Sequence, residues 1–427
     1  MRTFKSWLLA GCLVLLAAQT SFAAGFGIYE WSARGNALGG ATVGRADDPS
    51  ALASNPAGIT QLDGLQVLAG FTAIHPVLDV RTGNTWTSSD KDALWIPPHF
   101  YATWKVNDRY SIGLGTFSRF GLGSVFDENW TGRYNSYEAI IESVSINPNV
   151  AVKVTDKLSA AFGVDATYLN FALKKKINLS AIGSSDGDAQ LEADGMGYGF
   201  NMALHYQPCQ YAKLGLSYRS PVTMKVNGDA DFTRPADFNA GLVGTKAFTD
   251  TSASGTVTLP DSFSFGLAVY PTDKLSVEVG AVYTLWSKYD KLDINYGDNV
   301  ILQPGPTFVD QTSTPKNWSD VWRFNVGLEY AALDWLDLRL GYVYDQSPLN
   351  DDTIDYLVPA NDRHLFNGGL GFHWDSWTVD LNYTYLMILD RDIDGRNRYA
   401  DGTYEVYDGE IDNADAHMVG LSVGYKF

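Results

Sequence analysis

Stretches in which apolar side chains alternate with small or polar ones recur along nearly the whole chain. In the last stretch, one face of an extended strand would carry Val419, Leu421, Val423, Tyr425 and Phe427, and the other would carry Gly420, Ser422, Gly424 and Lys426. One apolar face, one small or polar face and a terminal aromatic are typical of a transmembrane β-barrel wall. A soluble β-sandwich can show the same alternation, so the rest of the chain must decide.

The alternating stretches number fourteen. We expect strands near residues 64–74, 94–106, 110–126, 137–153, 158–177, 192–206, 211–226, 256–270, 274–289, 319–330, 335–346, 362–374, 377–388 and 416–427. Tight connections such as 107–109 and 271–273 alternate mostly with long polar ones. Short turns at one end, long loops at the other and an even strand number indicate an outer-membrane barrel. The expected fold class is therefore all-β, an antiparallel transmembrane barrel occupying residues 63–427.

The first residues have the features of a secretory signal peptide. Arg2 and Lys5 precede an apolar run over residues 7–18, and Ser21-Phe22-Ala23 provides a small-x-small cleavage site. We therefore expect residues 1–23 to be removed on export. The run Leu9-Ala10-Gly11-Cys12 also resembles a lipoprotein processing box, although the apolar stretch before Cys12 is very short.

Composition agrees with an exported barrel in a Gram-negative outer membrane. Aromatic residues make up 13% of the chain, and there are 41 glycines. After the signal peptide, no run approaches the roughly 18 apolar residues of a membrane helix. Removing Arg2 and Lys5 from 31 basic residues leaves 29 against 49 acidic ones, a net charge of −20. This balance argues against nucleic acid as a partner.

A barrel of this size encloses a hollow that must be plugged or left open. Residues 24–62 precede the first strand and are rich in glycine and alanine, ending in Asn55-Pro56-Ala57-Gly58. Small residues allow a folded segment to pack tightly inside a lumen, so we expect an N-terminal hatch. A disordered periplasmic tail is the alternative, because composition alone does not separate the two.

The chain resembles the FadL-type outer-membrane transporters of long-chain fatty acids and other hydrophobic compounds. The resemblance runs nearly end to end and is carried by Ala24-Gly25-Phe26, Ala46-Asp47-Asp48, Asn55-Pro56-Ala57, Trp95-Ile96-Pro97, Phe120-Gly121-Leu122, Tyr344-Asp345-Gln346-Ser347-Pro348, Asn361-Asp362-Arg363 and the terminal Phe427. It implies a hatch, a capturing groove among the outer loops, an inner pocket and a kink in the third strand. That kink would open the wall sideways, so that ligand leaves into the bilayer.

Two strands carry residues that fit these roles. Glycines interrupt the third strand, and Gly121, which aligns with the family's kink, is our candidate for the lateral gate. Glycine in a strand can equally mark close packing. In the fifth strand, Leu169, Phe171 and Leu173 continue the inward face and Lys175 follows them, an arrangement suited to an amphipathic carboxylate. The alternative places Lys175 at a solvated loop edge.

Lys175 also matches, by the resemblance, a basic residue that binds the ligand head group in the family. A second basic residue of the family has no clear counterpart here. The alternation of side chains along their strands places Arg323 and Arg363 on the inward face, so these two residues are candidates to replace it. The terminal Phe427 is the expected assembly signal read by the barrel assembly machinery.

Other chemistry finds little support in the sequence. The six histidines are scattered, and there is no H-E-x-x-H motif and no G-x-S-x-G nucleophile turn, since the match over residues 420–424 lies within the last expected strand. We therefore expect no enzyme, although a triad assembled from distant strands is an alternative. The acidic run from Asp390 to Asp401 resembles the start of a calcium loop, but its arginines favour a surface loop. No cofactor and no metal ion are expected.

The sequence therefore predicts a passive importer of hydrophobic molecules, long-chain fatty acids first. Neutral aromatic or alkane hydrocarbons are the alternative ligands, and a general porin for polar solutes is the alternative class. Expected partners are the ligand, outer-membrane lipid and lipopolysaccharide. The expected state is a monomer.

Overall fold

The computed structural model describes residues 25–427 apart from 91, 245–246, 301–308 and 400. The predicted signal peptide, residues 1–23, lies outside the described residues. Within the described part of the chain, no helix is both long enough and apolar enough to span a membrane.

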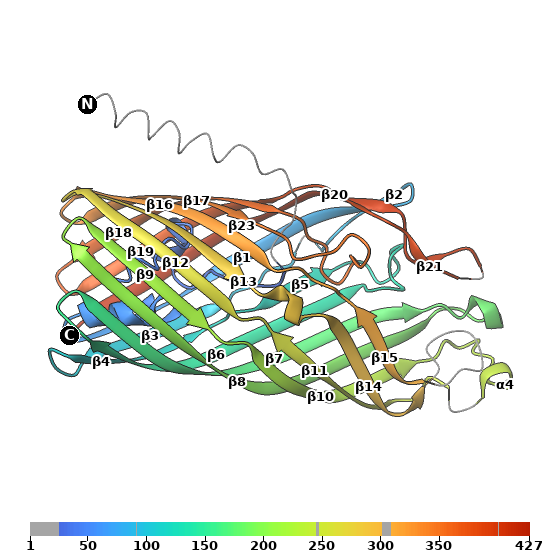
Figure 1. The fold of residues 1–427 in the computed structure, drawn as a ribbon. Helices are drawn as coiled ribbons and strands as arrows, with labels where there is room; N and C mark the ends of the chain where they lie inside the picture. The colour runs from blue at the N-terminus through green and yellow to red at the C-terminus, as the bar shows by residue number, and fades with distance from the viewer. Residues whose placement is uncertain (1–24, 91, 245–246, 301–308, 400) are drawn as a thin grey trace.

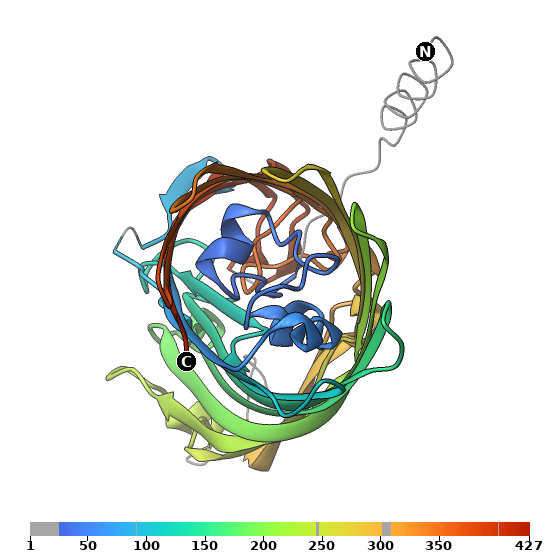
Figure 2. The same ribbon diagram turned by 90° about the vertical axis from the view of Figure 1, so that its left-hand side faces the viewer.

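Antiparallel strands form a closed ring, seen along its axis in Figure 2. As predicted, the described chain forms a barrel of fourteen strands, which closes where β1 (Leu65–Thr82) pairs with β23 (Gly409–Lys426). Figure 1 shows the other unbroken wall strands, which are β3 (Pro98–Lys105), β6 (Glu138–Lys153), β7 (Leu158–Ile177), β8 (Gly187–Cys209), β17 (Leu336–Asp345), β18 (Arg363–Trp374) and β19 (Trp377–Ile388). Closure pairs the backbone groups between strands, as a wall surrounded by lipid requires.

The remaining positions in the wall each consist of two consecutive strands instead of the single strand predicted. These pairs are β4 (Tyr110–Phe117) with β5 (Gly121–Val125), β9 (Ala212–Arg219) with β10 (Val222–Thr233), β11 (Thr251–Leu259) with β12 (Ser262–Thr272), β13 (Leu275–Thr284) with β14 (Lys291–Val300), and β15 (Val309–Pro315) with β16 (Val321–Leu333). Pro221 and Pro260 lie at two of the breaks, where a residue without an N–H cannot donate to the ladder.

Short elements complete the outer connections. They are β2 (Thr85–Ser88), η3 (Ser180–Ile182), α4 (Ala240–Val243), η4 (Trp286–Lys288), β20 (Arg391–Ile393), β21 (Arg396–Arg398) and β22 (Tyr404–Val406). Most of them lie at the end of the barrel away from the C-terminus (Figure 1). This end carries the long loops, so we describe it as the outer end.

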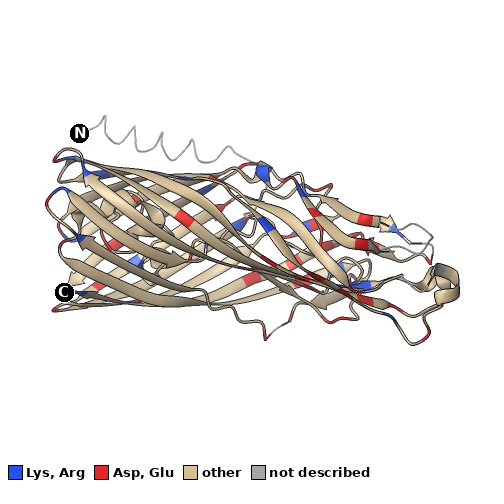
Figure 3. Ribbon diagram, turned by 90° about the horizontal axis from the view of Figure 1, so that it is seen from below, with Lys and Arg blue, Asp and Glu red and all other residues tan. Residues whose placement is uncertain are grey.

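The middle of the outer wall is apolar. On β7, Phe162 and Val164 are 53% and 47% exposed, whereas Asp165 and Thr167, on the opposite face, are fully buried. Charged residues are sparse over the middle of the wall and gather toward its two ends in Figure 3. An apolar outside with a polar inside is the pattern of a barrel that spans a membrane.

Residues 25–62, called the hatch segment below, lie inside the ring (Figure 2). Its short helical turns are α2 (Ala33–Ala37), α3 (Ala51–Ser54) and η2 (Pro56–Gln61), and their residues are mostly buried. Glycines of the wall allow this segment to approach closely: a Cβ on Gly215 would lie 1.9 Å from the Val43 carbonyl oxygen, and one on Gly341 would lie 2.4 Å from the Gly39 nitrogen. The lumen is therefore occupied.

The Asn55-Pro56-Ala57 motif shapes the turn of the hatch segment. The Asn55 amide nitrogen donates to the carbonyls of Val43 and Leu204, at 2.8 and 3.1 Å, and its side-chain oxygen accepts from the Ala57 N–H. One side chain thus connects two parts of the hatch segment with β8. All three residues of the motif are buried.

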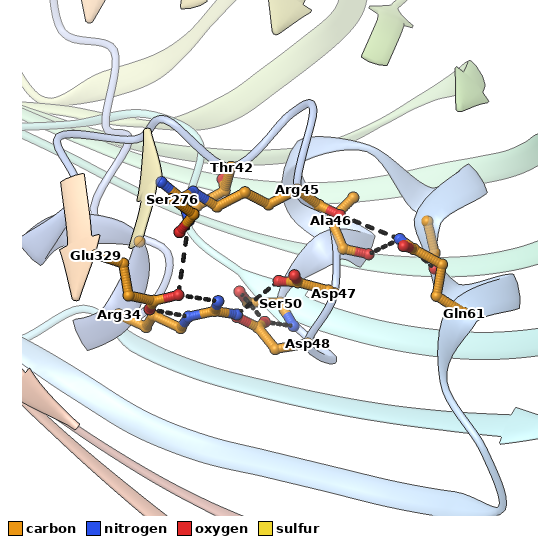
Figure 4. A network of polar contacts seen from close by, with 12 residues as sticks. Arg34, Thr42, Arg45, Ala46, Asp47, Asp48, Ser50, Gln61, Ser276 and Glu329 are labelled. Atoms are coloured by element: carbon orange, nitrogen blue, oxygen red, sulfur yellow. Dashed lines mark hydrogen bonds and ion pairs between the residues drawn. The ribbon is translucent and has the colours of Figure 1, made fainter. Parts of the chain in front are cut away.

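Ion pairs join the hatch segment to the wall (Figure 4), and their partners on the wall lie close to the short turns that precede β13 and follow β16. The Arg34 guanidinium donates to both carboxylate oxygens of Glu329 at 2.9 Å and to Asp47 at 2.8 Å. On the neighbouring strand, Glu278 is fully buried and accepts the backbone N–H groups of Gly44 and Arg45, each at 2.8 Å. Removing one partner would leave a buried charge uncompensated, so these contacts hold the segment firmly.

Candidate functional site

The third strand of the barrel is broken where the resemblance implies a kink. Residues 118–120 leave the ladder between β4 and β5, and the Ser143 hydroxyl of β6 donates to the Phe120 carbonyl at 2.6 Å. The first described residues of the hatch segment pair with this stretch instead. The Ile28 N–H donates to the Arg119 carbonyl at 2.8 Å, and the Gly121 N–H donates to the Phe26 carbonyl at 2.9 Å. The start of the hatch segment therefore takes the place of a strand at the break.

Beyond the break, β5 pairs with β6 on one side but with no described strand on the other. The Trp95 side chain lies beside β5, since a Cβ on Gly123 would lie 2.1 Å from the Trp95 ring. Trp95 is held by backbone hydrogen bonds in both directions with Ile74, at 2.8 and 2.9 Å. We predicted a strand over 94–106, but β3 begins only at Pro98. Trp95 therefore precedes β3 and lies beside the stretch of wall where β5 has a neighbouring strand on one side only.

A cavity of about 610 Å³ passes through this interruption. Its lining includes Ile141 and Ser143, which are buried on the inner face of β6, and also Glu142 and Val144, which are exposed on the outer face. Successive residues of a strand point to opposite faces. Because both faces of one wall strand line it, the cavity reaches from the lumen to the outside of the barrel.

Aromatic rings close the inner side of this cavity around the start of the hatch segment. The Phe26 ring lies 4.9 to 5.9 Å from the rings of Trp286, Tyr289, Trp318 and Phe120, mostly edge to face. Such pairs add roughly 0.5–1.5 kcal/mol each beyond burial. Phe26 is therefore a well-packed anchor at the inner boundary of the cavity.

A second cavity of about 470 Å³ lies among the outer strands and loops, and we call it the outer groove. Leu173 and Lys175 of the predicted binding patch line it, together with apolar residues of β8, β10 and β14. The Lys175 ammonium lies 3.9 Å from the Glu405 carboxylate, and its side chain is 37% exposed. The other two predicted residues lie deeper: Leu169 is buried in the apolar cluster below the groove, and Phe171 packs against that cluster.

The connection between β17 and β18, residues 346–362, separates the two cavities. Leu357 lines the outer groove, and the next residue, Val358, lines the inner cavity. A buried ion pair between Lys316 and Asp355, 2.5 Å long, holds this connection in place. A ligand passing from one cavity to the other must therefore displace apolar side chains.

Arg323 and Arg363 share one carboxylate. Their guanidinium groups lie 2.8 and 2.7 Å from the same oxygen of Asp345. Arg363 lines the inner cavity, whereas Arg323 is 5% exposed and stacks over the Tyr29 ring, with its guanidinium carbon 4.5 Å from the ring centre. Arg363 and Lys175 thus belong to different cavities.

The remaining predicted residues have well-defined places. Gly121 is the first residue of β5 and lines the inner cavity. The Phe427 N–H donates to the Leu65 carbonyl at 2.9 Å, and its ring packs against Tyr425, so the chain end completes the closing seam. Sequence reasoning missed Trp95 and Glu142 as cavity residues. The pair Pro97-Pro98 lies where β3 begins and has no N–H to donate to a ladder, and it was the available signal near Trp95.

An outer-membrane barrel with a filled lumen and a cavity through its wall belongs to the class of transport barrels. Residues 14–427 match the family model described as outer membrane protein transport protein (OMPP1/FadL/TodX). The chain therefore belongs to this family of transporters of hydrophobic compounds, in the outer membrane of Gram-negative bacteria.

Relatives of known sequence match along almost their whole length. The "47 kDa outer membrane protein" of Pasteurella multocida is 27% identical, covering 99% of both chains. The "long-chain fatty acid transport protein" of Escherichia coli O6:H1 is 25% identical, covering 90% of this chain and 91% of the relative.

Solved structures share the fold. A Pseudomonas aeruginosa FadL homologue has a TM-score of 0.82 at 21% identity, covering 95% of this chain and all of its own. The Pseudomonas putida toluene transporter TodX has a TM-score of 0.72 at 16% identity, covering 94% and 99%.

Proposed function

We propose that the protein passively imports long-chain fatty acids, capturing them in the outer groove, passing them to the inner cavity and releasing them sideways into the membrane. The observation that carries this proposal is the inner cavity, which is lined by both faces of β6. A water-filled pore does not help a solute that avoids water, whereas a route through the wall leads directly to lipid.

Capture relies on the outer groove. An acyl chain buried among its apolar side chains gains roughly 0.8 kcal/mol per CH₂. Lys175 at the same groove can form a charge-assisted hydrogen bond with the carboxylate. Glu405 competes for Lys175, but a distance of 3.9 Å makes this a weak partner.

The inner cavity suits the same ligand. Its volume falls in the range of about 300 to 1,000 Å³ that is typical of small-molecule sites. Arg363 and Arg323 together carry two positive charges against the single charge of Asp345. The surplus positive charge of this arginine pair favours an anionic head group beside Arg363. The other charged residues of the cavity lining, Glu30, Glu142 and Asp415, are acidic, so this preference is confined to the arginine pair. Phe120, Ile141 and Leu386 offer apolar contacts for the tail.

Release would occur where the cavity meets the outer face. Val144 and Tyr168, 36% and 40% exposed, are apolar neighbours of the opening. The ion pairs of Arg34 and the hydrogen bonds that Glu278 accepts hold the hatch segment near the short turns, which disfavours a straight passage to the periplasm. Residues 25–31, the first described part of the hatch segment, form no ion pair, and an apolar ligand can replace the ring contacts of Phe26, so this is the part expected to yield.

Neutral aromatic hydrocarbons are the second candidate ligands. Such ligands need the apolar lining but neither Lys175 nor Arg363, and both cations already have acidic neighbours. The fold is shared with the toluene transporter TodX. A general porin is disfavoured by the occupied lumen. Mass spectrometry of lipid extracted from the purified protein tests the choice: a bound fatty acid supports the first proposal, and hydrocarbon alone supports the second.

Lys175→Ala is expected to weaken oleate binding about fivefold, equivalent to about 1 kcal/mol, because the lost ion pair is partly exposed. Binding of a neutral hydrocarbon should stay nearly unchanged. Lys174→Ala is the matched control, because Lys174 pairs with Glu138 at 2.9 Å and does not line the groove. Equal losses for both ligands would assign Lys175 a structural role, and no loss for either would place it outside the binding site.

A further inference from the structure

A row of polar side chains crosses the outer face of the barrel beside the opening. Glu142, Asn170 and Asp194 are consecutive register partners on β6, β7 and β8, and all three belong to the outward-facing set of their strands. The next outward pair below them is apolar, namely Val144 and Tyr168. The outward pair above the row, Ile140 and Ala172, is also apolar, and the charged pair Glu138 and Lys174 follows it, so this row is the first polar one at the outer edge of the apolar band.

The opening lies at this level. Glu142 and Asn170 line the inner cavity together with Val144 and Tyr168, whereas Asp194 does not. An amphiphile that leaves here would keep its head group at the polar row and place its tail along the apolar side chains below. The head group would then pass beside the Glu142 carboxylate.

Glu142 carries an uncompensated charge. In the part of the chain that the structure describes, no basic nitrogen lies within 4 Å of its carboxylate. The nearest pair on the same face, Glu138 with Lys174, is neutral overall. The basic residue of the cavity, Arg363, is paired with Asp345 at the deep end. Moving outward, a ligand therefore passes from the pair of Arg323 and Arg363, whose two positive charges exceed the single charge of Asp345, to a mouth at which Glu142 repels anions.

Building on the lateral route proposed above, we propose that Glu142 determines which head groups leave through the wall. Its negative charge retards carboxylate anions and favours uncharged heads, such as alcohols or protonated acids, that can hydrogen-bond to Glu142 and Asn170. A fatty acid accordingly leaves tail first, with its head retained near Arg363 until the tail is in lipid. Glu142 is thus a specificity residue of the exit, distinct from the capture step at Lys175.

The test compares two ligands with the same chain, oleate and oleyl alcohol. Their transfer into lipid vesicles containing the purified protein is measured at about pH 9, where a free carboxylate is ionised. Glu142→Gln should raise the ratio of oleate to oleyl alcohol transfer about fivefold at low salt, and added salt should shrink this gain by screening. Glu142→Lys should raise the ratio further.

Asp194→Asn is the matched control. It removes the same charge from the same row, about 10 Å away at two strand spacings, and does not touch the cavity. The ratio should stay at the wild-type value in this variant. An unchanged ratio in Glu142→Gln, or an equal change in Asp194→Asn, would overturn the role of Glu142.

The lateral route has its own control in the same assay. If Gly121→Val blocks transfer of both ligands while Glu142→Gln leaves the ratio unchanged, the route stands and only the inference about Glu142 is wrong. If Gly121→Val leaves transfer of both ligands intact, the route itself is wrong, and the inference falls with it.

Discussion

Deletion of residues 24–60 will turn a closed barrel into one that conducts ions. The hatch segment fills the lumen, and its backbone lies against the wall at Gly215 and Gly341. A ring of fourteen strands without this filling leaves a water-accessible hollow. Single-channel recording in planar bilayers should show no steady current for the full chain and a stable open current for the deletion variant.

The empty barrel should remain folded. Wall residues that now pair with the hatch segment, such as Glu278 and Glu329, would be hydrated by the water that replaces it, so they would not be left in an apolar interior. Heat-modifiable migration in gels reports the folded barrel independently of current. A folded deletion variant with no current would show that the hatch segment does not close the lumen.

Gly215→Leu provides a second route to the same outcome without a deletion. Any Cβ at this position meets the Val43 carbonyl oxygen at 1.9 Å, a contact that the backbone cannot accommodate without moving. The hatch segment should be displaced, and intermittent currents should appear. Gly368→Leu is the control, since the nearest atom to its Cβ, on Leu340, is 3.8 Å away.

The alternation of side chains predicted the barrel well because membrane and lumen impose opposite demands on the two faces of each strand. The alternation did not predict strand ends that lie outside the membrane, because there both faces of a strand can be polar. Two strands extend beyond the part that faces the membrane, namely β1 in its outer half, up to Thr82, and β23 in its first residues, from Gly409. Their outward side chains are polar there, so the alternation of apolar and polar residues is lost. Two of the breaks in the wall strands coincide with Pro221 and Pro260. The alternation continues past each proline, so it predicted one strand where the structure has two.

The residues that line the two cavities were harder to predict, because strand parity gives the face of the wall on which a residue lies but not its depth. Parity grouped Leu169 with Lys175, yet Leu169 is buried below the outer groove while Lys175 lines it. Trp95 and Glu142 escaped notice for a different reason. Their role depends on the missing ladder beside β5, which is a long-range feature that no local pattern carries.

No local pattern in the sequence carried the contacts of the hatch segment. Its small residues indicated close packing inside a lumen. The pairing of Phe26 and Ile28 with the break in the third strand joins residues about ninety positions apart, and it depends on the closed ring. This pairing brings the start of the hatch segment to Gly121.

Gly121→Val will abolish oleate uptake while leaving the barrel folded and the outer groove able to bind. Gly121 lines the inner cavity, and a Cβ there would lie 2.4 Å from the Cδ1 atom of Ile28. That atom is the end of a flexible side chain, so the backbone can stay in place while Ile28 shifts. The branched valine and the displaced isoleucine would then occupy the space through which a ligand leaves, and valine also favours a continuous ladder.

The measurement pairs cellular uptake of labelled oleate with equilibrium oleate binding to the purified variant. Gly121→Ala should give an intermediate uptake, because a single methyl group requires only Ile28 to move. Gly368→Val, with its open surroundings on β18, controls for placing valine in a wall strand. Uptake at the wild-type rate in a folded Gly121→Val barrel would rule out the lateral exit and favour passage past a displaced hatch segment. Loss of uptake with intact binding separates capture at the outer groove from release at the break, since a defect in the fold would remove both.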